Sequence, residues 1–169
     1  MSNQKQLTIN HKPLTINLGF TLIELLIVIS IIGILVTIIS ASFVTSQKQA
    51  RDVQRKSDLR QYQNSLESFA NGNKSLFPAR STAAVVASTT LCSDLNVYLN
   101  PDIVCSEDPK PLVYTYKYWS DGTDGTVNAT TYVLWAKLES ASTTAYWVLC
   151  SNGRSGSTAT VPVSAVCPI

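Results

Sequence analysis

Histidine is almost absent from the chain, since the 169 residues contain only His11. Beyond His11, a Ser-His-Asp or Cys-His mechanism has no imidazole to act as its general base. The sequence also has no glycine-rich phosphate loop. We therefore expect a protein that is not an enzyme and that uses no cofactor.

Charge is also scarce, with 13 Lys+Arg against 11 Asp+Glu and a formal net charge of +2. So small a net charge gives no reason to expect direct nucleic-acid binding. From Phe20 to Val44 the only ionisable residue is Glu24. A bilayer core needs about 20 apolar residues in a helix, so we expect residues 20–44 to span a membrane once.

Proline is missing from Phe20 until Pro78, and Gly33 and Gly72 are the only glycines after Phe20 in that stretch. One continuous helix is therefore permitted from about Phe20 to Asn71. Its second half, residues 45–72, is polar apart from a narrow stripe with steps of 3, 4 and 3, which predicts one buried helical face. The stripe consists of Leu59, Tyr62, Leu66 and Phe69.

Beyond residue 72 the composition shifts to Ser, Thr, Asn, Pro and Tyr, which predicts a separate module. We expect residues 73–111 to be a connecting region with a short helix near residues 93–100. Residues rich in β-formers predict three strands in meander order, at residues 112–119, 131–138 and 145–150. The expected fold class is α+β, with the long helix packed on a small antiparallel sheet head at residues 112–169.

All four cysteines lie in the C-terminal module. No pair has the close spacing of common zinc sites, and an even number of cysteines in an exported module favours disulfides. Three pairings are possible. We favour Cys92 with Cys105 and Cys150 with Cys167, because each bond closes a local loop.

Residues 1–19 form a basic leader that contains Lys5 and Lys12 and no acidic residue. The leader lacks the apolar stretch of a secretory signal peptide, so any cleavage would leave the hydrophobic segment in the mature protein. The string that follows, GFTLIELLIVISIIGIL, resembles the prepilin-type cleavage and methylation site of type IV pilins and of the pseudopilins of type II secretion. The resemblance is close from Leu18 to about Tyr62 and fades in the C-terminal module.

The resemblance implies specific roles for three residues. A prepilin peptidase would cut between Gly19 and Phe20, Phe20 would be N-methylated, and Glu24 would be the family's buried acid. An ionisable residue within a span usually has a partner, and the α-amino group of Phe20 in a neighbouring subunit is the obvious one. Pairing would neutralise both groups on assembly and set the register of the helices.

Five basic residues follow the apolar segment and form what we call the basic collar: Lys48, Arg51, Arg55, Lys56 and Arg60. The collar could contact lipid headgroups or pair with acids of neighbouring subunits. Solvation of the helix is the default interpretation.

Asp121, Asp124 and Asn128 lie in one turn and are the chain's candidate calcium ligands. Their spacing does not match an EF-hand, and Asp-Gly turns are mostly hairpin loops. We therefore expect no metal site, and calcium stays the alternative.

Taken together, the resemblance implies a structural subunit that polymerises into a type IV pilus-like filament for adhesion, motility or DNA uptake. A pseudopilin of a secretion or competence system is the alternative, and a single-pass anchored binding module is a remote one. The implied partners are copies of the chain, prepilin peptidase, an inner-membrane assembly platform and, before assembly, lipid. The implied location is the bacterial cytoplasmic membrane with the C-terminal module outside, and then a cell-surface filament.

Overall fold

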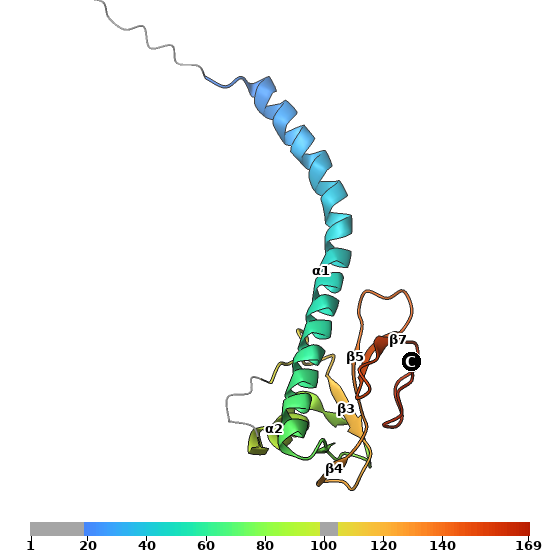
Figure 1. The fold of residues 1–169 in the computed structure, drawn as a ribbon. Coiled ribbons are helices and arrows are strands. Elements are labelled where there is room, and N and C mark those ends of the chain that lie inside the picture. Colours follow the sequence, from blue (N-terminus) through green and yellow to red (C-terminus); the bar gives the residue numbers. More distant parts are fainter. Residues whose placement is uncertain (1–18, 99–104) are drawn as a thin grey trace, which may run out of the picture. The chain divides into compact units, whose positions relative to one another are not determined.

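The structure is a computed structural model that describes residues 19–98 and 105–169. The chain divides into two compact units, Met1–Ala41 and Ser42–Ile169. Helix α1, Leu22–Gly72, begins in the first unit and ends in the second (Figure 1). Residues 1–18 of the expected leader lie outside the described residues.

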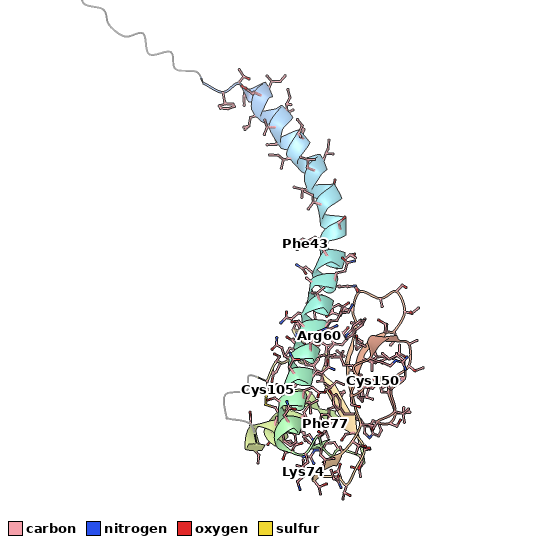
Figure 2. All side chains as sticks on the ribbon, viewed as in Figure 1. Phe43, Arg60, Lys74, Phe77, Cys105 and Cys150 are labelled. Carbon is pink, nitrogen blue, oxygen red and sulfur yellow. A yellow bond between two sulfur atoms is a disulfide. The ribbon has the colours of Figure 1, made fainter. Side chains whose placement is uncertain are left out.

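The described part of the first unit consists of residues 19–21 and the apolar beginning of α1. Its side chains extend away from the helix axis (Figure 2), and those described are exposed. A helix satisfies its own backbone hydrogen bonds, as any segment placed in lipid must do. Two described segments of α1, Leu22–Thr37 and Ser42–Gly72, each lack the length and apolar composition of a membrane-spanning helix. Taken together, the two segments have that length and composition.

The expected long helix is confirmed, and it ends at Gly72. The N–H of Ser75 donates to the carbonyl of Ala70 at 2.8 Å, which closes the last turn in a Schellman-type arrangement. Lys74 and Ser75 adopt left-handed conformations, with φ of 55° and 63°. Neither is glycine, so this helix end carries backbone strain.

The second unit contains two antiparallel sheets after the end of α1. The larger has the order β2-β3-β5-β6-β7, and the smaller pairs β1 with β4. The elements are β1 Phe77–Pro78, β2 Val85–Val86, the π-helical turn η1 Ala87–Leu91, α2 Cys92–Tyr98, β3 Lys117–Ser120, β4 Val127–Ala129, β5 Tyr132–Lys137, β6 Tyr146–Cys150 and β7 Ser155–Thr158.

Two expectations about this unit need correction. Residues 73–111 are more than a connection, because they supply strands to both sheets as well as α2. The first predicted strand, residues 112–119, is a strand only from Lys117, and Leu112 is fully exposed. A turn explains this difference, since the N–H groups of Val113 and Tyr114 both donate to the carbonyl of Lys110. The β3-β5-β6 meander itself is as expected.

The main core lies between α1 and one face of the five-stranded sheet, which we call the inner face. The predicted stripe is fully engaged, with Leu59, Leu66 and Phe69 at 0% exposure and Tyr62 at 3%. Opposite it, Tyr118, Leu134 and Leu149 are cross-strand neighbours on β3, β5 and β6. This packing holds the C-terminal part of α1, green in Figure 1, on the sheet.

The opposite face of the sheet, the outer face, has a smaller apolar cluster. Val133, Trp135, Val148 and Cys150 are buried there, and Cys167 and Ile169 of the C-terminal tail pack against them. A disulfide between Cys150 and Cys167 ties the tail to β6. The tail therefore covers part of the outer face.

Candidate functional site

The residues expected to be processed lie immediately before α1. Gly19 and Phe20 are outside the helix, and the Phe20 side chain is 81% exposed. Helix α1 begins at Leu22, so Thr21 occupies the N-cap position. The structure thus places Gly19, Phe20 and Glu24 within one stretch at the start of the helix.

The side chain of Thr21 caps this helix. The N–H of Glu24 donates to the hydroxyl oxygen of Thr21 at 3.3 Å, and the Thr-x-x-Glu spacing is that of a capping box. An acidic residue in the first turn also interacts favourably with the helix dipole. This contact was missed in the sequence analysis, although the Thr21-to-Glu24 spacing could have revealed it.

The segment that follows is an exposed apolar surface. The large apolar side chains described between Leu22 and Val44 are 45% to 89% exposed. Burying one such side chain is worth about 1.5–3 kcal/mol. This surface has the chemistry of one that lipid or other helices cover.

A buried charge cluster forms a second site, in the head, and was not predicted. The Arg55 side chain is 0% exposed and donates to three carboxylates. It binds Asp108 through two nitrogens at 2.6 and 2.8 Å, Asp52 at 2.8 Å and Glu139 at 2.6 Å. Arg55 therefore joins α1 to two loops that lie 53 and 84 residues further along the chain.

Further cations complete this charge cluster. Arg51 binds Glu139 through two nitrogens, at 3.0 and 2.7 Å, and Lys110 Nζ lies 3.1 Å from the same carboxylate. Asp52 also accepts from the backbone N–H groups of Glu139 and Ser140. With three cations and three carboxylates, the charge cluster is formally neutral.

These contacts correct the default interpretation of the basic collar. Arg51 and Arg55 pair with acids of their own chain, and the Lys56 ammonium lies 4.4 Å from the centre of the Trp147 ring. Of the five collar residues, Arg60 is exposed. The positive charge that the sequence placed on the helix is therefore partly neutralised inside the head.

The surroundings shift the pKa values of two carboxyl groups in the charge cluster. Hydrogen bonds from Arg51, and then from Arg55 and Lys110, hold the pKa of Glu139 far below its usual value against the opposing effect of burial. Burial alone would raise the pKa of Asp52, but the hydrogen bonds from Ser140, Glu139 and Arg55 lower it. Both groups therefore stabilise the fold in their ionised forms.

The three candidate calcium ligands accept hydrogen bonds from backbone N–H groups in the structure. Asp121 accepts from the N–H groups of Thr130 and Thr131, Asn128 accepts from Thr123, and Asp124 accepts from Ser81. Within residues 19–98 and 105–169, no group of three His, Cys, Asp or Glu side chains is arranged to hold a metal. Asp121 and Asn128 bind backbone groups of the turn, and Asp124 joins the turn to Ser81.

Both disulfides of the structure are the pairs expected from local loop closure, Cys92 with Cys105 and Cys150 with Cys167. Figure 2 shows Cys150 on the sheet, where it joins the tail to the outer face. The first bond joins the start of α2 to the segment that leads toward β3. Both bonds thus fasten segments that have little regular structure of their own.

Residues 16–40 match the family model of the prokaryotic N-terminal methylation motif, the signature of type IV pilins and pseudopilins. No curated protein and no solved structure gives a significant match. The resemblance seen in the sequence is thereby confirmed for the N-terminal segment. The motif implies a membrane-anchored precursor, processing by a prepilin peptidase and self-assembly, in a class of structural proteins that are generally not enzymes.

Proposed function

We propose that the protein is a pilin-type structural subunit. In this proposal, cleavage between Gly19 and Phe20 and N-methylation of Phe20 release a mature chain that polymerises through α1 into a surface filament. The inner-membrane assembly platform extracts the subunit from the lipid. The subunit itself performs no covalent chemistry.

The observation that carries the proposal is the exposed apolar part of α1, which coincides with the methylation motif. The main core of the protein is already complete without this segment, because the sheet packs on Leu59, Tyr62, Leu66 and Phe69. The apolar segment is therefore available for lipid and then for the same segment of other copies. Small residues such as Gly33, where a Cβ would meet nothing beyond the helix's own nearby backbone, would let these helices approach closely.

Glu24 gives the contact its register. Glu24 is exposed in the first turn of α1, where a carboxylate transferred into an apolar bundle would be costly without a partner. Cleavage would create an ammonium group at Phe20, four residues before Glu24. An incoming subunit whose Glu24 meets the Phe20 ammonium of a neighbour neutralises both charges.

The test compares Glu24→Gln with Glu107→Gln, an exposed acid of the head that serves as the matched control. We expect both variants to enter the membrane and to begin at Phe20 by N-terminal sequencing. Electron microscopy of sheared surface filaments, with mass-spectrometric identification of the subunit, should show filament loss only for Glu24→Gln.

The other outcomes separate the competing functions. An uncleaved wild-type chain that does not self-associate would show an anchored binding module instead. A cleaved chain that forms no surface filament but is needed for protein secretion would show a pseudopilin. Normal filament yield from Glu24→Gln would refute the pairing of Glu24 with Phe20.

A further inference from the structure

The outer face of the sheet is only partly covered by the C-terminal tail, and a groove of about 340 Å³ remains open beside it. Small-molecule sites usually have volumes of about 300–1,000 Å³. Trp135 lies in the lining, and the half-buried Tyr114 and Tyr146 flank it. Val161 and Pro162 of the tail form an apolar wall.

The strand register places two lysines among these aromatic side chains. Lys117 on β3 is directly opposite Trp135 on β5, and Lys137 on β5 is directly opposite Tyr146 on β6. Cross-strand partners lie on the same face of a sheet, so both lysines belong to the groove. Lys117 and Lys137 are therefore diagonal neighbours on adjacent strands.

Neither lysine is neutralised within the described residues. No carboxylate there lies within 4.0 Å of the Lys117 or Lys137 ammonium, and none lines the groove. The Tyr114 ring contacts two cations, because Arg55 Cζ and Lys137 Nζ lie 4.6 and 5.9 Å from its centre. Two like charges held close together favour an anion as the missing partner.

The aromatic lining indicates which class of anion the groove would bind. The faces of aromatic rings carry negative potential, which attracts the C–H bonds along the flat face of a pyranose ring. A long polyanion is disfavoured, because residues 81–169 carry four Lys+Arg against seven Asp+Glu and would repel charge outside the groove. A peptide added as a strand would need a sheet edge, whereas this groove lies over the sheet face.

We propose that the groove formed by Trp135, Tyr146, Tyr114, Lys117 and Lys137 binds a short anionic saccharide, with its ring against the half-buried Tyr146 and Tyr114 above the buried Trp135 and its carboxylate or sulfate between the two lysines. The groove belongs to the second unit, whereas the residues proposed for processing and assembly belong to the first. The filament would then present one such site for each subunit whose outer face stays accessible.

The test is calorimetric titration of the purified full chain in a detergent without sugar headgroups. The probe is a monosulfated, uronic-acid-containing disaccharide, and lactose, hexaglutamate and a short thymidylate oligonucleotide are the comparison ligands. We expect the sulfated disaccharide to bind about tenfold or more tightly than each of these. Equal or tighter binding of any comparison ligand, or no binding of the disaccharide, would overturn the proposal.

Variants assign the binding to the groove. Lys117→Gln with Lys137→Gln should weaken disaccharide binding about tenfold or more, whereas Arg60→Gln with Lys74→Gln, which removes the same charge from exposed positions, should not. Thr115→Glu is a second groove variant at an exposed lining position and should also abolish binding by placing a carboxylate beside the lysines. Unchanged binding in correctly folded groove variants would refute the site.

Discussion

Replacing Arg55 with methionine should destabilise the head more than any other single change in a charged residue. Methionine keeps the apolar part of the side chain but removes every hydrogen bond that the guanidinium donates. Asp52 keeps its two backbone donors, and Glu139 keeps Arg51 and Lys110. Asp108 loses both of its guanidinium contacts while its side chain is only 1% exposed.

The magnitude follows from this buried carboxylate, which loses its paired charge but keeps a hydrogen bond from the backbone N–H of Lys110. Removing one partner of a buried ion pair costs about 3–5 kcal/mol, which is a large share of the about 5–15 kcal/mol that stabilises a typical domain. With a urea dependence of about 1–3 kcal/mol per molar, the unfolding midpoint should fall by about 1 M or more. The change in midpoint should occur without a large change in slope.

The assay is urea unfolding of the full chain in a non-ionic detergent, followed by tryptophan fluorescence. The three tryptophans, Trp119, Trp135 and Trp147, all lie in the head, so the signal reports the unit that contains Arg55. Arg60→Met is the matched control because Arg60 is an exposed arginine on the same helix. A loss below about 1 kcal/mol for Arg55→Met, or an equal loss for Arg60→Met, would show that the charge cluster does not hold the helix to the head.

The same assay has a pH dependence with a defined sign. Asp52 and Glu139 have lowered pKa values in the folded protein, so their contribution is complete above the unfolded values of about 4 and declines as the pH falls below them. Arg55→Met removes part of the cause of both shifts. The free energy of unfolding of Arg55→Met should therefore fall less steeply with decreasing pH than that of the wild type.

Mass spectrometry of a non-reduced tryptic digest should show Cys92 linked to Cys105 and Cys150 linked to Cys167; a peptide joining Cys92 to Cys150 would contradict the fold around both. Lys74→Gly should raise the stability by about 0.5–1 kcal/mol in thermal unfolding, because glycine tolerates the φ of 55°, and no gain would mean that the turn relaxes. Gly122→Ala should cost about 1–2 kcal/mol or more, since a Cβ there would lie 2.3 Å from Asn128 Oδ1. Gly153→Ala, at a similar φ but in open space, should cost less, and equal costs would leave no role for the steric contact.

The apolar face of α1 was predictable because its residues repeat with the helical period. The steps of 3, 4 and 3 place four side chains on one side of a helix, and all four are buried: Leu59, Tyr62, Leu66 and Phe69. The motif at Gly19, Phe20 and Glu24 was equally readable, because so few sequences combine a glycine, an acid and a long apolar run in that order.

The charge cluster was not predictable, because it continues the same helical face with polar residues. Asp52 and Arg55 extend the spacing of the stripe toward the N-terminus, but charged side chains on a helix normally face solvent. Their partners Asp108 and Glu139 lie in loops, where no periodicity marks them. Only the fold brings the four together.

The short strands were missed for a different reason. Strands β1 and β2 have two residues each, which is too few to show alternation, and β1 includes Pro78, a residue that argues against a strand. Conversely, the β-forming residues of 112–116 suggested a strand where a turn around Lys110 sets the backbone. Local composition does not reveal which strands pair across long sequence distances or which backbone hydrogen bonds form a turn.

The position of the charge cluster has a mechanical consequence. After Ser42, the first buried side chain of α1 is Asp52, and Arg55 follows one turn later, before the apolar stripe begins at Leu59. Tension applied along the chain from its N-terminal side therefore reaches ion pairs before it reaches the apolar core. Hydrogen-bonded ion pairs are short-ranged and directional, so they resist small displacements and fail abruptly. A subunit under pulling force would release α1 from the head in two steps, and the first of these would come at lower force in acid than at neutral pH.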